Sequence, residues 1–564
     1  MLAPVPSLRR NGDLGIGDTE ALRQLVDWAV EAKVGILQLL PINETGADHS
    51  PYNAISSVAL EPALIHLRGL EELSKEDMDG IRTAIPEAVI KGDLVDYAAV
   101  KLVKRGGLET AFDRFWKAPH EGARWEAYVK FCAEEEEWLQ DYCQFRWCMD
   151  LEGGSEEWSV WSLNYNRPET ARAWIADRLV KAPAKTERQL AFFAWVQFAA
   201  FTQWRAVRAY AEERDVLLMG DVPIGISYCS HDVFFEPQWF DLEWSGGAPP
   251  ERVFKDDDFA VKWGQNWGIP LYKWDVLKAD GFRWWKRRIE KLVDVFGVFR
   301  IDHILGFYRI YSFPWRPRRN AEFLGLDHEE ARRRTGGRLP GFKPHPDDSN
   351  ENRASNLADG DCYLRAVQEA AGDKEVVGED LGAVPDYVRP HLKEIGIAGF
   401  KVMHWEVQRG EDGEEHPVAG GDYDECGFAT YATHDHLTMA AMWDEFRDCL
   451  DDPDPGVRGG AGWNLRILSE IAGLTVPEDR KSYVPYDDEV KWAMMKGLLD
   501  CNSRYAAFMI TDLYGMKERF NVPGTVGGSN WRVRMPFMVA DMTERPEMWA
   551  EAEKLRELVE ETGR

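Results

Sequence analysis

The stretch Gly297-Val-Phe-Arg-Ile-Asp-His-Ile304 decides the fold and also holds the first candidate functional residues. Its apolar run is typical of a short strand buried in a sheet. Side chains two positions apart share one face of a strand, so Arg300 and Asp302 are expected to point the same way. The guanidinium then favours the ionised form of the carboxylate. Such a pair is either a structural ion pair or the setting of a nucleophilic carboxylate, of the kind that retaining glycosidases use.

Two further strand-like runs end in acidic residues and favour the functional interpretation. One is Val376–Leu381, which carries Glu379, and the other is Phe428–Asp435, which ends at Asp435. In a barrel of parallel strands, the carboxyl ends of several strands converge on one face. Because clustered like charges repel each other, folding alone does not readily explain three strand-terminal acids.

Short apolar runs recur along the chain and predict a parallel sheet. Strands that are apolar almost throughout are buried on both faces, as parallel strands are, and helical patterns separate most of these runs, as βα repetition requires. We therefore expect an α/β fold, a (β/α)8 TIM barrel that forms one catalytic unit over residues 1–564, with a weaker eighth strand near Val58–His66. The seven clearer runs are Lys33–Pro41, Val216–Val222, Val298–Ile304, Val376–Leu381, Gly399–His404, Phe428–His434 and Ala506–Leu513.

Two long segments are predicted to interrupt the barrel. Residues from about 70 to 210 are charged, rich in tryptophan and helical in period, which indicates a large helical insertion. Residues from about 316 to 360 are polar and are expected to form a lid or surface excursion. The most apolar stretch, Leu190–Trp204, contains two glutamines. It is too short and too polar to span a bilayer, so it is expected to be a core helix.

Several collinear motifs, together with the order R-x-D, G-E and H-D, resemble the α-amylase clan of glycoside hydrolases. The finer resemblance is to the 4-α-glucanotransferases, also called amylomaltases or disproportionating enzymes, of glycoside hydrolase family 77. It covers almost the whole chain and supports the closure of the barrel. The motifs are Leu14-Gly-Ile-Gly-Asp18, Gln38-Leu-Leu-Pro-Ile-Asn43, Ser50-Pro-Tyr-Asn53, Gly220-Asp-Val-Pro-Ile224, Gly246-Gly-Ala-Pro-Pro250, Gln265-Asn-Trp-Gly-Ile-Pro-Leu-Tyr272, Gly378-Glu-Asp-Leu-Gly382 and Asn521-Val-Pro-Gly-Thr525.

The resemblance implies a role for each residue that matches the family pattern. Asp302 corresponds to the nucleophile, Glu379 to the general acid/base, and Asp435 to the third carboxylate, which binds sugar hydroxyls. Glu379 and Asp380 should face opposite ways on a strand, and the family pattern selects Glu379. His434 and Asp435 cannot both point inward on an ideal strand, so the strand is expected to bend there. The implied substrate-binding residues are Arg300, His434, Asp221, Tyr52, Trp267, Ser50, His303 and Asn521.

The composition of the chain limits the kinds of partner and metal site that it can be expected to have. The net charge is −29 and the isoelectric point is about 4.9, which argues against nucleic acid and anionic membranes. The eight cysteines contain no C-x-x-C pair, so neither a zinc site nor a disulfide framework is predicted. The N-terminal residues lack the apolar core of a secretory signal. We expect a cytoplasmic enzyme without metal or cofactor, and the resemblance implies that its substrates are α-1,4-glucans and maltooligosaccharides.

The sequence departs from the family pattern in places, and it leaves two alternatives open. Residues 251–264 are longer and more charged than usual and are expected to form a mobile loop that gates the substrate. Ile269 stands where Asn is common, and His436 follows the third carboxylate. The alternatives to a transferase are a hydrolase of the same clan and a catalytically silent glucan-binding protein. The preferred glucan length, the natural glucan and the oligomeric state are not determined by the sequence.

Overall fold

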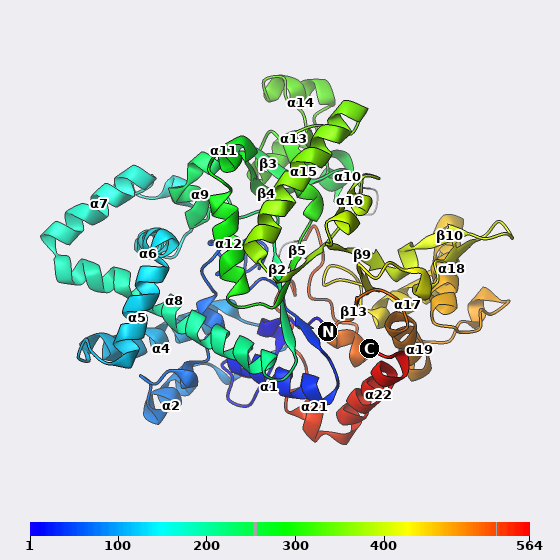
Figure 1. The fold of residues 1–564 in the computed structure, drawn as a ribbon, viewed down its shortest axis with the longest axis horizontal. Coiled ribbons are helices and arrows are strands. Elements are labelled where there is room, and N and C mark those ends of the chain that lie inside the picture. Colours follow the sequence, from blue (N-terminus) through cyan, green and yellow to red (C-terminus); the bar gives the residue numbers. More distant parts are fainter. Residues whose placement is uncertain (252–256, 526) are drawn as a thin grey trace.

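The fold is built on a parallel sheet of seven strands (Figure 1). The structure is a computed structural model that describes residues 1–251, 257–525 and 527–564. All seven predicted strands are confirmed, although most are shorter than their apolar runs. In spatial order they are β1 (Ile36–Gln38), β2 (Leu217–Val222), β5 (Val298–Ile301), β8 (Glu375–Gly378), β9 (Ala398–Val402), β12 (Gly427–Thr430) and β13 (Tyr505–Ala507).

The N-terminal residues close this sheet into a barrel. Leu2 forms parallel bridges to Gln38 of β1 and to Met509 beyond β13, so it connects the two edge strands. The Leu2 amide donates to the Phe508 carbonyl at 2.8 Å, and the Ala3 amide donates to the Gln38 carbonyl at 2.9 Å. The predicted (β/α)8 barrel is therefore confirmed, but the prediction of its eighth strand was wrong.

The stretch that was expected to supply the eighth strand forms short turns instead. Residues 58–66 contain the 3-10 helix η2 (Pro62–Leu64), and Leu60 forms a one-residue antiparallel bridge to Asn43. A bridge of one residue leaves no alternating pattern in the sequence, whereas 58–66 has an apolar run. The apolar side chains of this run are buried without joining the sheet.

Helices cover the outside of the barrel and fill the long connection between β1 and β2. The apolar residues that face outward from the strands, such as Phe299 and Ile301, pack against these helices, while Met219, Val377, Phe400 and Phe428 fill the inside. The helices around the barrel are α1 (Thr19–Glu31), α12 (Arg283–Val293), α15 (Asn350–Ala371), α16 (Val388–Glu394), α17 (Met439–Asp448), α18 (Pro455–Ile471), α19 (Asp488–Leu499) and α22 (Pro546–Thr562).

The connection between β1 and β2 is helical, and it lies on the left in Figure 1. The predicted core helix lies within α8 (Pro183–Glu212), whose residues from Phe192 to Phe201 are buried throughout. Among the residues that the structure describes, no helix is long and apolar enough to cross a membrane. The other helices of this connection are α2 (Lys75–Ala84), α3 (Glu87–Lys91), α4 (Tyr97–Lys117), α5 (Ala123–Glu134), α6 (Glu136–Leu151) and α7 (Pro168–Lys181).

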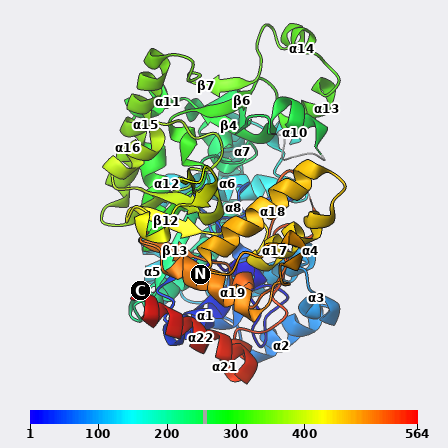
Figure 2. The same ribbon diagram turned by 90° about the vertical axis from the view of Figure 1, so that its right-hand side faces the viewer.

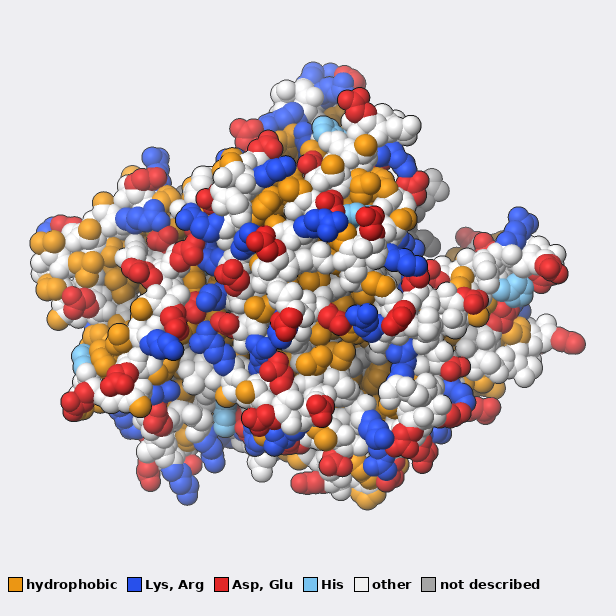
Figure 3. Space-filling model, viewed as in Figure 1, with side chains coloured by type: hydrophobic (Ala, Val, Ile, Leu, Met, Phe, Trp, Pro, Cys, Tyr) orange, Lys and Arg blue, Asp and Glu red, His pale blue; other side chains and the backbone are white. Residues whose placement is uncertain are grey.

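A second, antiparallel sheet stands at the opposite end of the molecule from α22 (Figure 2), and the sequence analysis missed it. Its strand order is β4 (Gln265–Tyr272), β3 (Phe240–Ala248), β6 (Ile310–Phe313) and β7 (Gly341–Lys343). The polar excursion at 316–360 contributes β7, α13 (Asn320–Phe323) and α14 (His328–Arg334). Acidic and basic side chains are interspersed over the face of the molecule that Figure 3 shows.

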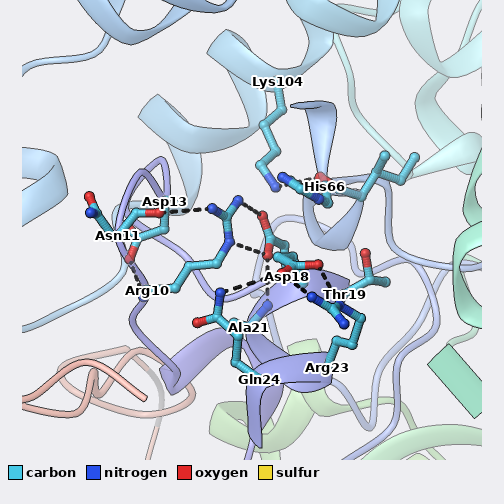
Figure 4. Close-up of polar contacts among 12 residues, drawn as sticks. Arg10, Asn11, Asp13, Asp18, Thr19, Ala21, Arg23, Gln24, His66 and Lys104 are labelled. Carbon is cyan, nitrogen blue, oxygen red and sulfur yellow. Dashed lines mark hydrogen bonds and ion pairs between the residues drawn. The ribbon is translucent and has the colours of Figure 1, made fainter. Parts of the chain in front are cut away.

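A buried polar network fixes the loop between Leu2 and α1 (Figure 4). Asp18 caps α1 by accepting from the Ala21 amide, and Arg10 donates to both Asp18 carboxylate oxygens at 2.8 and 2.6 Å. A Cβ atom on Gly17 would lie 1.9 Å from the Val5 carbonyl oxygen, so only glycine fits there. The Gly-Ile-Gly-Asp motif thus secures the loop that follows the closing residue of the barrel.

Candidate active site

Arg300 on β5 is the centre of the candidate site, because it contacts three carboxylates. Its Nη1 donates to both oxygens of Asp221 on the neighbouring strand β2, at 2.8 and 2.7 Å. Its Nη2 donates to Oδ1 of Asp302 at 3.0 Å and lies 3.9 Å from Oε2 of Glu379. Arg300 and Asp302 therefore share a face of the strand, as the alternation of side chains predicts.

Glu379 follows β8 and has a carboxyl group that holds its proton at neutral pH. Burial raises its pKa most, Arg300 opposes this effect and the nearby Asp302 adds to it, so that the pKa is raised to about 8. The backbone amide of His303 donates to its Oε2 at 2.7 Å. A carboxyl group with this pKa can donate a proton near pH 7 and accept one later.

Asp302 lies directly after β5, where the chain turns sharply. Burial raises its pKa and outweighs Arg300, which acts in the expected direction by favouring the ionised form. The next residue, His303, has φ +47°, in the left-handed region that non-glycine residues rarely adopt. This turn points the His303 amide at Glu379 and so links the two strand ends. Backbone strain of this kind is common at functional sites.

Asp435 belongs to a loop rather than to a strand. β12 ends at Thr430, so the chain has left the sheet before His434 and Asp435, in agreement with the predicted bend. Asn521 Nδ2 donates to Asp435 Oδ1 at 2.6 Å. Burial alone raises the pKa of Asp435, but His434 and Asn521 outweigh it and leave the pKa below its usual value. Of the carboxyl groups at Asp221, Asp302, Glu379 and Asp435, that of Asp435 alone has a pKa below its usual value.

Tyr52 contacts both Asp221 on β2 and His434 in the loop after β12. Its hydroxyl donates to Asp221 Oδ2 at 2.6 Å, and its ring stacks on His434 with centroids 5.1 Å apart and planes at 13°. An aromatic ring beside carboxylates offers both an apolar face and polar groups to a sugar. The structure thus brings Tyr52, Asp221 and His434 together.

Two exposed tryptophans lie beside these groups. Trp267 on β4 is 38% exposed and contacts the His303 ring edge-on, with centroids 4.9 Å apart. Trp405, which the sequence analysis did not select, is 47% exposed after β9 and contacts His436. Its position directly after the predicted strand Gly399–His404 was the signal that could have identified it.

The other predicted residues differ in how directly they meet the site. Ser50 lies two residues before Tyr52, but among the described residues its hydrogen bonds are local, with the amide donating to Asp48 Oδ1 at 3.1 Å. Asp380 faces away from the site, as alternation requires. It accepts from the Phe400 amide at 2.6 Å and from Arg389 Nε at 2.9 Å.

The segment 251–264 was expected to be a mobile gating loop, and only part of it can be compared with that expectation. Residues 252–256 lie outside the described residues. From Asp258 the segment is the helix α10 (Asp258–Trp263), capped by the Asp257 carboxylate. Trp263 is buried and donates from Nε1 to the Phe323 carbonyl at 3.1 Å. The expectation of a loop was therefore wrong for 258–263, and substrate gating stays a prediction.

Comparisons with known proteins point to one enzyme family. The family model of glycoside hydrolase family 77, described as 4-alpha-glucanotransferase, matches residues 3–540. The 4-alpha-glucanotransferase of Chlamydia caviae is 28% identical over 541 residues, which is 96% of this chain and 91% of that protein. That of Thermus thermophilus is 29% identical over 538 residues, covering 93% of this chain and 92% of that protein.

A solved structure shares the fold over its full length. The amylomaltase from Streptococcus agalactiae, solved in complex with acarbose, matches with a TM-score of 0.75 at 24% identity. The match covers 100% of this chain and 99% of that chain. With a family model that spans nearly the whole sequence, the chain belongs to the 4-alpha-glucanotransferases of glycoside hydrolase family 77 and is a glycosyltransferase.

Proposed function

We propose that the enzyme transfers α-1,4-glucan segments by a double displacement at Asp302 and Glu379. The Asp302 carboxylate attacks the anomeric carbon while the bond to the leaving oxygen breaks, and Glu379 gives its proton to that oxygen. The 4-hydroxyl of an acceptor then attacks the covalent intermediate, passes its proton to Glu379 and releases Asp302. Two inversions retain the α-linkage.

The observation that carries this proposal is that two carboxyl groups lie beside one guanidinium, at different distances from it. Arg300 Nη2 lies 3.0 Å from Asp302 and 3.9 Å from Glu379, and the pKa of Glu379 is raised to about 8. An acid and a nucleophile differ in protonation, and retaining enzymes hold them roughly 5–5.5 Å apart. Asp302 is the better candidate for the nucleophile because Arg300 bonds it directly.

The remaining groups are proposed to bind the sugars. Asp435, His434, Asp221 and Tyr52 form the wall that takes the ring under attack, and Asn521 and Arg300 fix two of these carboxylates. Trp267 is an exposed face for the acceptor sugar, with His303 at its edge, and Ser50 lies near the same wall. The proposed substrates are α-1,4-glucans and maltooligosaccharides.

Maltotriose as the only substrate tests the proposal. Transfer yields glucose and longer chains at a constant number of reducing ends, and this is the expected result for the native enzyme. Asp302→Asn and Glu379→Gln should both lose this product ladder while remaining folded. A steady rise in reducing ends without longer products identifies a hydrolase and contradicts the proposal.

A further inference from the structure

Trp531 has a backbone conformation that bulky residues rarely adopt, and two hydrogen bonds keep it there. Its φ is +63°, in the left-handed region. Its amide donates to the Phe520 carbonyl at 2.8 Å, and its own carbonyl accepts from the Tyr97 hydroxyl at 2.9 Å. The peptide groups on both sides of Trp531 are therefore held, one by its own loop and one by α4. Residues that are held in such rare backbone conformations cluster at active sites and ligand-binding sites.

The indole of Trp531 contacts the two rings that line the proposed sugar site. Its centroid lies 5.5 Å from Tyr52 and 5.8 Å from His434, tilted by 47° and 48°. Tyr52 and His434 are stacked on each other, so the three rings form one cluster. Since aromatic pairs prefer defined geometries, the indole restricts the positions that the other two rings can take.

A pocket of about 550 Å³, its open mouth included, lies against Trp531. Its lining includes Pro51, His49, Tyr97 and Phe520, and is mostly apolar. The Tyr97 ring stacks on His49 with centroids 4.6 Å apart. Trp531 thus borders this pocket and also contacts the Tyr52–His434 pair.

We propose that Trp531 is a positioning residue of the transfer reaction. Its indole holds Tyr52 and His434 against the bound sugar, and it keeps water of the neighbouring pocket away from the glucosyl intermediate. Tyr97 sets the conformation of Trp531 through the hydrogen bond to its carbonyl. This inference rests on the proposed function, because it requires an intermediate that water and a sugar compete to attack. A sugar acceptor prevails over water only when the site is ordered and dry.

Four variants test the inference on maltotriose, with reducing ends and product lengths followed together. Trp531→Ala is expected to lower kcat/KM roughly tenfold, since small misplacements at a site are costly, and to raise the hydrolysed share of turnovers severalfold. Trp531→Phe keeps an aromatic ring, so its kcat/KM and its hydrolysed share should both lie close to those of the native enzyme. Tyr97→Phe removes only the hydroxyl and should shift the hydrolysed share in the same direction by less. Trp549→Ala, on α22, removes another half-buried indole and is the matched control.

The outcomes separate a positioning role from a structural one. The control should lower the melting temperature and leave the hydrolysed share unchanged. Tyr97→Phe should add nothing in the Trp531→Ala background, because it acts through the indole. A native hydrolysed share and native KM in both Trp531 variants would overturn the inference. If Asp302→Asn retains activity, the proposed function fails instead, so the two failures are distinguishable.

Discussion

The two sides of the site are built in different ways. On one side, Arg300, Asp302 and Glu379 sit on or directly after the parallel strands β5 and β8, whose hydrogen bonds fix their spacing. On the other side, Tyr52 and Asp435 sit in loops, and contacts made by side chains hold them. Groups whose separation must stay constant to within a few tenths of an ångström belong on rigid elements. Loops suit groups that recognise the rest of the substrate.

This contrast predicts different kinetic losses on the two sides. A change on the strand side should act on the chemical step and lower kcat. A change on the loop side should act on sugar binding and raise KM as well. Variants on the two sides therefore test this division.

Asp302→Asn should lower kcat by roughly 10³-fold or more, because it removes the proposed nucleophile and keeps the shape of the side chain. Steady-state kinetics on maltotriose measure the loss, and thermal unfolding checks that the protein is intact. The melting temperature should change little, since the amide can still accept from Arg300. A folded variant with native kcat would remove Asp302 from the mechanism and the strand side from the chemistry.

The rate should fall with rising pH above about 8, because the first step needs Glu379 in its protonated form and its pKa is raised to about 8. Each further pH unit should lower the rate at which the covalent intermediate forms by about tenfold. The pH profile of kcat/KM measures this in the free enzyme. A rate that is flat from pH 7 to 10, with the fold intact, would show that Glu379 is not the acid.

The same division explains how much the sequence could predict. The alternation of side chains placed Arg300 and Asp302 on one face and separated Glu379 from Asp380, because both patterns are local. The seven strands followed from apolar runs for the same reason. These features depend on residues that are close in sequence.

The features that the sequence could not give depend on distant residues. Leu2 closes the barrel through one-residue bridges to Gln38 and Met509, which leave no periodic pattern. The strand β3 pairs with β4 across register shifts that disturb the alternation. Trp531 meets Tyr52 only after the barrel has formed, nearly 480 positions apart in the chain. Long-range packing of this kind must be seen in the structure.

On the loop side, Asn521→Ala should have a smaller effect and a different form. It removes the bond to Asp435 Oδ1, which favours the ionised carboxylate and helps to keep its pKa below the usual value. The pKa of Asp435 should therefore rise, so activity should be lost at a higher pH on the acid side. We expect KM to rise by about tenfold, the equivalent of one charge-assisted hydrogen bond. Asn352→Ala, which removes a bond to Asp348 on the surface, is the control.

An acid limb and KM that match the native enzyme would contradict the division between the two sides. The same holds if Asn521→Ala lowers only kcat, because a loop-side change would then act on the chemistry. The comparison of Asn521→Ala with Asp302→Asn at several pH values separates these outcomes.

The smallest expected effect is that of chelators, which should leave activity unchanged on both sides of the site. Within the described ranges, no three His, Cys, Asp or Glu side chains are grouped as a metal-binding set. Arg300 bonds both Asp221 and Asp302 and so offsets part of their negative charge, and two carboxyl groups suffice for the chemistry. Activity after dialysis against EDTA, compared with a mock-dialysed sample, measures this. A reversible loss that one added divalent ion restores would show that a cation, rather than Arg300 alone, organises the strand side.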